Sequence, residues 1–313
     1  MASTRTPRAL TIAGSDSGGG AGIQADLKAF ARCGVHGCCA ITAITAQNTL
    51  GVSAIHPVAP EMVLAQVRAV VSDIGVDAVK VGMLGDVPTI RAVAKALDEL
   101  EPGTPVVVDP VMVAESGARL LDPDAQGALV AEILARATVL TPNVPEAREL
   151  LRYAGVDAGG SGGDDVGGSG SRDRDVDDSH GGDDGHDVGG GGRNEQQEAE
   201  ALARGVLGLG PRAVVLTGGH REQAVDLLVS SWETSRRALA IPGKRHRDGS
   251  AHGSGCTHSS VLAAQLALGR ELSQAAIAAR ALAGEAVANG LCDVGKGPGP
   301  VDVIGLSSLR AGR

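Results

Sequence analysis

The sequence predicts an α/β protein built on a mostly parallel central sheet with helices on both faces. Short apolar runs that suit buried strands alternate with amphipathic helical patterns along most of the chain, and this alternation indicates βαβ units. Hydrophobic residues make up 43% of the 313 residues, but aromatic residues make up only 1%. Such a chain is long enough for a substantial core, which must be assembled from Ala, Val, Leu and Ile.

Each predicted element is defined by its apolar periodicity and by the polar or glycine-rich residues around it. Predicted strands are short apolar runs, and predicted helices carry apolar residues three and four positions apart. Parallel strands are predicted at 9–13, 40–46, 78–82, 106–109, 139–141 and 213–217, antiparallel strands at 224–230 and 237–241, and helices at 21–32, 61–72, 87–100, 123–136 and 197–207, with two more beginning at Cys256 and Leu272. Ligands of such sheets bind beyond the carboxyl ends of the strands, so polar residues that follow strands are the first candidates for a site.

One long segment interrupts this pattern. Residues 157–193 contain 14 glycines and 10 aspartates, a composition that cannot bury enough apolar surface to fold by itself. Glycine and aspartate also recur in calcium-binding repeats, but the nonapeptide period and its apolar position are missing here. We therefore expect a single domain over residues 1–313 that carries a disordered surface insertion at 157–193.

Composition also argues against several classes of protein. The net charge of −9 and the scarcity of aromatic residues argue against a nucleic-acid partner. No apolar run reaches the roughly 18 residues that a membrane span needs, and the N-terminus has no signal-peptide core. The five cysteines form neither a regular disulfide framework nor a paired CxxC motif. We expect a cytoplasmic protein, and the sequence leaves room for a homo-oligomer.

The first motif with chemical potential is the glycine cluster GSDSGGGAGIQADLKAF at residues 14–30, between a predicted strand and a predicted helix. Its GxGxxA spacing, from Gly20 to Ala25, matches the relaxed form of a dinucleotide-binding fingerprint. That interpretation requires an acidic residue about 20 positions later to hold a ribose. No Asp or Glu occurs between Asp26 and Glu61, so the motif does not indicate an oxidoreductase.

A second motif, HGSGCT at residues 252–257, precedes an apolar, alanine-rich helical run. Gly253, Ser254 and Gly255 can point backbone N–H groups in one direction, and the helix dipole adds positive potential. The turn therefore suits a phosphate or a developing negative charge. A cysteine at such a helix start is expected to have a pKa below the free value of about 8.5, which makes Cys256 a candidate nucleophile or general base.

Acidic side chains follow two of the predicted strands. Asp109 lies in VVVDPVM, and Asn143 and Glu146 lie one helical turn apart in TPNVPEA. Carboxylates at strand ends beside a phosphate site suit Mg²⁺, which usually binds few protein oxygens and several waters. Taken singly, Asn143 could equally be a helix cap and Glu146 a partner of the helix dipole.

Eight motifs occur in order along the chain, interrupted only by the segment at 157–193. They are GSDSGGGAGIQADLKAF, ITAITAQNTLGV, VKVGML, VVVDPVM, LTPNVPEA, VVLTGGH, GSGCT and GKGPGPV. In this order they resemble the bacterial hydroxymethylpyrimidine and phosphomethylpyrimidine kinases of thiamine biosynthesis, within the ribokinase-like superfamily. The resemblance implies a three-layer ribokinase-like fold, with ATP as phosphoryl donor and Mg²⁺ as cofactor. The implied acceptor is a small pyrimidine, phosphorylated first on its hydroxymethyl group and then on the resulting monophosphate.

The resemblance also implies a pyrimidine site near Gly14, Asp26, Gln47 and Met83. The carboxamide of Gln47 suits an aminopyrimidine edge, because its oxygen and its N–H group can match the donor and the acceptor of the ring. Met83 would cover the face of the ring.

For the reaction itself, the resemblance implies that Cys256 is the base, at a position where many related sugar kinases have aspartate. It further implies an anion hole at Gly253, Ser254 and Gly255, a metal site at Asp109 and Glu146, and nucleotide or phosphate contacts at Asn143, Thr217 and Gly218. The chain departs from the usual pattern at Thr217, where related kinases have a lysine before Gly-Gly-His.

Two other functions are compatible with this sequence. A pyridoxal or pyridoxine kinase on the same scaffold would bind a different ring, and competing turnover of the two alcohols would distinguish it. A catalytically silent vitamin-binding protein would bind the pyrimidine without ATP hydrolysis or phosphoryl transfer.

We predict that the insertion is dispensable for the chemistry. When residues 157–193 are replaced with a short Gly-Ser linker, turnover should stay within about tenfold of the original, because polar surface segments tolerate replacement. Steady-state rates and thermal unfolding of both proteins check this. A larger loss of turnover in a protein that remains folded would contradict the prediction.

Overall fold

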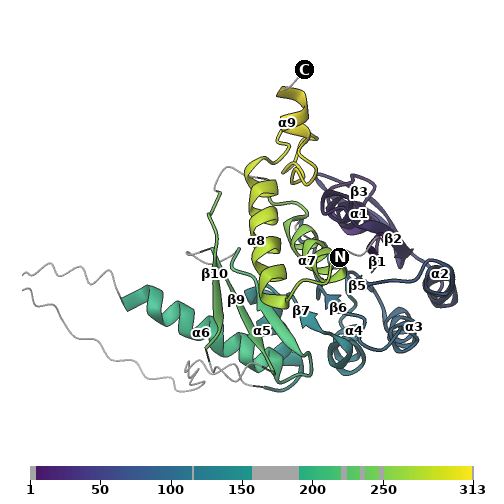
Figure 1. Cartoon of the computed structure of the whole chain (residues 1–313), viewed down its shortest axis with the longest axis horizontal. Helices are drawn as coiled ribbons and strands as arrows, with labels where there is room; N and C mark the ends of the chain where they lie inside the picture. Colours follow the sequence, from purple (N-terminus) through teal and green to yellow (C-terminus); the bar gives the residue numbers. More distant parts are fainter. Residues whose placement is uncertain are drawn as a thin grey trace, which may run out of the picture.

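The computed structural model describes residues 5–114, 116–156, 190–219, 224–232, 237–246 and 250–311. Its centre is an eight-stranded sheet in the order β10-β9-β8-β7-β6-β5-β1-β2. Neighbouring strands from β2 across to β8 run parallel, whereas β9 and β10 are antiparallel to their neighbours. The predicted α/β class with a mostly parallel sheet is confirmed (Figure 1).

The strands of this sheet lie close to the predicted apolar runs. They are β1 (Arg8–Ala13), β2 (His36–Ile41), β5 (Ala78–Val81), β6 (Val106–Val108), β7 (Val139–Leu140), β8 (Ala213–Leu216), β9 (Val225–Ser230) and β10 (Leu239–Pro242). The central strands β5 to β8 are buried at every residue, as expected for a sheet that is covered on both faces.

Helices form the outer two layers, and the C-terminal helix α9 projects beyond them (Figure 1). They are α1 (Gly22–Arg32), α2 (Pro60–Asp73), α3 (Val87–Asp98), α4 (Ala125–Ala128), α5 (Val144–Tyr153), α6 (Gly190–Leu207), α7 (Ser254–Ala267), α8 (Leu272–Ala288) and α9 (Leu306–Ala311). One core cluster packs α2 to α6 on one face of the sheet, and another packs α1, α7 and α8 on the opposite face. Within β6, Val106 and Val108 join the first cluster and Val107 joins the second, because successive side chains of a strand point to opposite faces.

The strand predicted at 40–46 is in fact parts of two strands that belong to different sheets. β2 ends at Ile41, and β3 (Ala43–Asn48) pairs with β4 (Gly51–Pro57) in a separate antiparallel hairpin. The chain bends at the buried residue Thr42, whose hydroxyl donates to the carbonyl oxygen of Met83 at 2.7 Å. The apolar run continues through the bend, so hydrophobicity alone did not mark it.

Two helices differ from the prediction. The helix predicted at 123–136 is α4 followed by a π-helical turn (Leu129–Ile133) and a 3₁₀ turn (Leu134–Arg136). α5, which the sequence-based element order lacked, begins directly after Asn143. The motif TPNVPEA therefore forms the capped start of a helix at the edge of the sheet.

The predicted insertion falls mostly outside the described residues. α6 begins at Gly190, so the last residues of the predicted segment belong to this helix, and the disorder expected at 157–189 lies outside the described part. Within the described residues, the structure contains no helix that combines the length and the apolar character needed to cross a membrane.

Candidate active site

The parallel strands bring most of the candidate residues to one edge of the sheet. Gly14 follows β1, Met83 follows β5, Asp109 follows β6, Asn143 follows β7 and Thr217 follows β8. Cys256 lies in the first turn of α7, which packs against β1, β5 and β6. The carboxyl edge of the sheet, where ligands of this fold class bind, therefore collects residues that are far apart in the sequence.

Two pyrimidine candidates, Gly14 and Met83, are in contact. A Cβ atom at Gly14 would lie 3.0 Å from Cε of Met83, so a larger residue there would displace the methionine. Gln47 lies on β3, and its backbone exchanges hydrogen bonds of 2.7 and 2.8 Å with the Ser17 hydroxyl, in the loop that follows β1. The side-chain Oε1 of Gln47 lies 3.4 Å from the Thr45 hydroxyl, and its Nε2 has no partner within the described chain.

Asp26, a third pyrimidine candidate, lies beneath the carboxyl edge of the sheet and has no exposed surface there. Its side chain is fully buried, and its two carboxylate oxygens accept hydrogen bonds of 2.6 Å from the hydroxyls of Thr11 and Ser260. Nζ of Lys80 lies 3.0 and 3.1 Å from the same two oxygens. A carboxylate without exposed surface cannot contact a ligand in this arrangement. The predicted substrate contact is therefore corrected: Asp26 is the counter-ion of Lys80.

Lys80 is a residue that the sequence-based prediction missed. It lies on β5 with no exposed surface, next to Thr11 in the parallel register of β1. Burial acts to lower the pKa of its ammonium group, but neighbouring acidic groups, Asp26 foremost, raise it above the usual value. The sequence does contain a signal for this residue: a lysine inside the apolar run AVKVGML. A buried lysine needs a counter-ion, because burial of an isolated charge is costly.

The turn before α7 requires glycine because two loops meet there. Gly253 has a φ of 84°, which lies in the left-handed region that favours glycine. A Cβ atom at this position would overlap the carbonyl oxygen of Gly20. Nε2 of His252 lies 3.1 Å from Asp16, which also accepts three backbone hydrogen bonds in the first glycine cluster. Asp16 and His252, neither of which was predicted as functional, hold the two loops together.

The free backbone donors of this turn differ slightly from the prediction. The N–H of Ser254 already donates to the carbonyl oxygen of Ala251 at 2.8 Å, so it is not available to an anion. The N–H groups of Gly255 and Cys256 have no hydrogen-bond partner within the described residues, as is usual for the first turn of a helix. These two groups at the positive end of α7 could bind an anion, and we call them the anion cradle.

The thiol of Cys256 does not have the lowered pKa expected from its place at a helix start. The residue is partly exposed, but its sulfur is so closely surrounded that burial raises the pKa of Cys256 to about 12. The charge of Lys80 and the N–H of Gly22 act in the opposite direction, whereas Asp26 and Asp109 raise the pKa further. The prediction of a low-pKa thiolate is therefore wrong, because the sulfur is buried and carboxylates lie near it.

Asp109 and Glu146 form a close acidic pair. Asp109 accepts a hydrogen bond of 3.0 Å from the hydroxyl of Ser259, and burial raises its pKa. Burial, with the charge of Asp109, raises the pKa of Glu146 to about 8. Asn143 caps α5: its side chain accepts from the N–H of Glu146, and the Glu146 carboxylate accepts from the N–H of Asn143, both at 2.9 Å. This capping box fixes the Glu146 carboxylate at the edge.

The donor set of this pair fits Mg²⁺. A cation would relieve the repulsion that raises the pKa of Glu146, and Mg²⁺ commonly binds through one or two carboxylates together with waters and substrate phosphates. In the part of the chain that the structure describes, no group of three or more His, Cys, Asp or Glu side chains could hold a metal ion. Oxygens from water or from a nucleotide could complete a metal site at Asp109 and Glu146.

The loop after β8 carries the remaining nucleotide candidates. Thr217 pairs with Asn143 in a parallel bridge, which aligns the two loops. The N–H of Gly218 donates at 2.8 Å to the buried carboxylate of Asp226 on β9, and Nε2 of His258 on α7 lies 3.2 Å from the same side chain. The predicted phosphate loop is thus connected to the helix that carries Cys256 by two residues that sequence reasoning missed.

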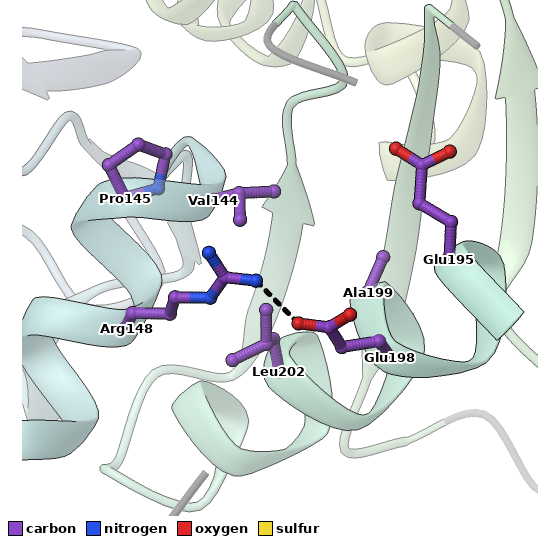
Figure 2. Close-up of a pocket in the computed structure, with 7 residues that line it drawn as sticks. All are labelled: Val144, Pro145, Arg148, Glu195, Glu198, Ala199 and Leu202. Atoms are coloured by element: carbon purple, nitrogen blue, oxygen red, sulfur yellow. Dashed lines mark hydrogen bonds and ion pairs between the residues drawn. The ribbon is translucent and has the colours of Figure 1, made fainter. Parts of the chain in front are cut away.

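Two hollows in the surface do not contain the candidate residues. One of about 270 Å³ lies between α5 and α6 and is crossed by the ion pair of Arg148 with Glu198 (Figure 2). The other, of about 470 Å³, lies between β10 and α8 and is lined in part by Lys244, His246 and Arg280. The candidate site is therefore defined by the strand edge and not by these two hollows.

Comparison with known proteins decides the family. The family model for phosphomethylpyrimidine kinase matches residues 16–158 and 189–302. The chain belongs to the phosphomethylpyrimidine kinase family. A hydroxymethylpyrimidine/phosphomethylpyrimidine kinase from Rhizobium meliloti is 42% identical over 299 residues, which cover 95% of this chain and 96% of the relative. The corresponding kinase from Bacillus subtilis is 37% identical over 94% of each chain. The resemblance seen in the eight motifs is confirmed, and the protein is a kinase.

Solved structures of related kinases show the same architecture. A Bacillus subtilis pyridoxal kinase in complex with ADP has a TM-score of 0.74 and 32% identity, over 97% of this chain and 99% of that one. A phosphomethylpyrimidine kinase from Clostridium difficile has a TM-score of 0.64 and 34% identity, over 88% and 96%. The predicted three-layer ribokinase-like fold is confirmed. The family match is interrupted only between residues 158 and 189, inside the segment that the sequence predicts to be an insertion.

We predict that Gly253→Ala lowers both the stability and the kcat of this kinase. Left-handed backbone strain costs a residue with a Cβ about 1–2 kcal/mol, and displacement of the Gly20 carbonyl would misplace the anion cradle, for which about a 10²-fold loss of kcat is typical. Gly34→Ala is the matched control, because Gly34 also has a positive φ, of 74°, but has open space around it. Denaturant unfolding and steady-state kinetics measure both effects. Equal losses in the two variants would show that the contact with Gly20 is unimportant.

Proposed function

We propose that this kinase phosphorylates 4-amino-5-hydroxymethyl-2-methylpyrimidine with ATP, and then phosphorylates the monophosphate to the diphosphate, in thiamine biosynthesis in the cytoplasm. The observation that carries the proposal is the start of α7, where two free N–H groups and a thiol lie close to the acidic pair at the sheet edge. Curated relatives with 36–42% identity, named for both phosphorylations, support the choice of substrate.

The phosphoryl group would be held by the anion cradle. Phosphoryl transfer passes through a loose transition state, so catalysis depends mainly on positioning and on stabilising negative charge. The N–H groups of Gly255 and Cys256 and the dipole of α7 supply donors where that charge develops. Asp109 and Glu146 would bind Mg²⁺, which neutralises phosphate charge when bound. Residues of the neighbouring strand ends, Asn143, Thr217 and Gly218, would contact the nucleotide.

Cys256 would accept the proton of the substrate hydroxyl. With a pKa of about 12, the thiol is protonated at neutral pH, so the thiolate has to be favoured by the loaded site. The negative charge of Asp109 contributes to this raised pKa, and neutralisation of that carboxylate would lower it. A base that accepts its proton late in the transfer is sufficient for a loose transition state.

The pyrimidine would lie at the corner formed by Gly14, Met83 and Gln47. The free Nε2 of Gln47 and its weakly bonded Oε1 offer the donor and acceptor that an aminopyrimidine edge requires. Met83 contacts Gly14 across this corner, which supports its assignment to the face of the ring. Asp26 would support the site from below through Lys80, without touching the substrate.

A pyridoxal kinase is the second candidate function, because pyridoxal kinases from Bacillus subtilis and Staphylococcus aureus share this architecture with TM-scores of 0.74. The deciding experiment incubates the purified protein, ATP and Mg²⁺ with the pyrimidine, with pyridoxal, or with both, and identifies the products by mass spectrometry. We expect pyrimidine monophosphate and then diphosphate. Phosphorylation of pyridoxal alone would overturn the proposal, and pyrimidine binding without any product would indicate a silent vitamin-binding homologue.

We predict that Cys256→Ala lowers kcat by about 10²–10⁴, the usual range for loss of a general base. The KM values for both substrates should change little, because the backbone donors of the cradle remain. Steady-state kinetics with a product assay measure both parameters. Cys292→Ala is the control, since Cys292 is an exposed cysteine that lies outside α7. A Cys256→Ala variant with near-normal kcat would refute the base assignment.

We predict that Gln47→Leu weakens pyrimidine binding by roughly 1–3 kcal/mol, because it leaves polar atoms of the ring without partners. Isothermal titration with the pyrimidine measures the change, and titration with ATP under the same conditions should be unaltered. If the affinity for the pyrimidine is unchanged, Gln47 does not belong to the site.

A further inference from the structure

A fully buried ion pair lies one helical turn below Cys256. Residues four positions apart on a helix lie on the same face, so α7 presents Cys256 and Ser260 to the same neighbours. The hydroxyl of Ser260 donates to Oδ1 of Asp26 at 2.6 Å, and Nζ of Lys80 lies 3.0 Å from that oxygen. Ser260 and Asp26 therefore connect α7 to the buried ammonium group of Lys80.

The surroundings of the ion pair leave it little freedom. A Cβ atom at Gly82 would lie 2.8 Å from Nζ of Lys80, so the ammonium group fills the space beneath the end of β5. Neither Lys80 nor Asp26 has exposed side-chain surface. Charges that are shielded from water in this way act strongly on nearby groups.

We propose that Lys80 and Asp26 act on the reaction through Cys256: Lys80 stabilises negative charge on the sulfur, and Asp26 opposes it. Both are positioning residues, because neither can touch a substrate from its buried place. This inference rests on the proposed function, in which Cys256 accepts the substrate proton.

Other groups also act on the charge of the sulfur. The carboxylate of Asp109, after β6, destabilises negative charge on the sulfur, and the N–H of Gly22 at the start of α1 stabilises it. Glu146 on α5 and His258 on α7 interact with Asp109. Among the groups that favour the thiolate, the charge of Lys80 has the largest effect. Its removal should therefore have a measurable effect.

The test is the rate at which iodoacetamide alkylates Cys256 across a range of pH, which reports the thiolate fraction without any need for activity. Trypsin releases residues 248–270 as one peptide, in which Cys256 is the only cysteine. At a fixed pH below the thiol pKa, Asp26→Asn should raise the rate and Lys80→Met should lower it, each by about tenfold for one unit of thiol pKa. Lys95→Met, an exposed position on α3, should leave the rate unchanged.

A second comparison keeps the test decisive if Lys80→Met fails to fold with Asp26 left unpaired. The double variant Asp26→Asn/Lys80→Met contains no unpaired buried charge and retains a side chain that can bond to Thr11 and Ser260. Compared with Asp26→Asn alone, it should show about a tenfold lower alkylation rate. Circular dichroism and thermal unfolding establish that each variant is folded under the assay conditions.

Opposite shifts in the two single variants, or the expected difference between Asp26→Asn and the double variant, support the proposal. Equal rates in all variants overturn it, and so do shifts in one common direction, which would indicate that a packing defect simply exposes the thiol. The pH profile of kcat is measured in parallel and should shift with the alkylation profile. If the alkylation rates shift and the pH profile of kcat does not, Lys80 and Asp26 do not act on the reaction and Cys256 is not the base. Product analysis would still show independently whether the protein phosphorylates the pyrimidine.

Discussion

The ammonium group of Lys80 has no contact with water, and much of the active-site edge is arranged around it. Burial of an isolated charge is costly, so the fold supplies Asp26 as counter-ion and the hydroxyls of Thr11 and Ser260 as donors to that carboxylate. These partners come from α1, β1 and α7. The first glycine cluster precedes α1, and the anion cradle lies in the first turn of α7. The ion pair holds these two helices together, because Asp26 on α1 bonds to Ser260 on α7.

Around this pair the site contains more acid than base. Asp26, Asp109 and Glu146 surround a region in which Lys80 is the buried cation, and burial raises the pKa values of Asp109, Glu146 and Cys256. Such a region is incomplete without added positive charge. A nucleotide accompanied by a divalent cation would supply both the phosphate that the helix start can bind and the charge that the carboxylates need. Binding and activation of the site would in this way depend on the same ligand.

The sequence predicted those features that depend on local pattern. Strand and helix alternation revealed the sheet and its edge, and the GSGCT turn revealed a helix start that could bind a phosphate. The features it missed depend on contacts between distant segments. The role of Asp26 follows from Lys80, which is 54 residues away, and the pKa of Cys256 follows from burial of its sulfur and from carboxylates on other elements. The bend at Thr42 depends on a hydrogen bond to Met83, which no periodicity in the segment 40–46 could show.

The high pKa of the Cys256 thiol has a consequence for the lifetime of the enzyme in an oxidising environment. Oxidation of cysteine to sulfenic acid and beyond begins with the thiolate and depends on access to it. A closely surrounded sulfur that keeps its proton while the site is empty is a poor target for peroxide, although Cys256 as a residue is partly exposed. Bound substrates that favour the thiolate would also cover it. Chemical protection of the sulfur would therefore follow from the same burial and neighbouring carboxylates that delay its deprotonation.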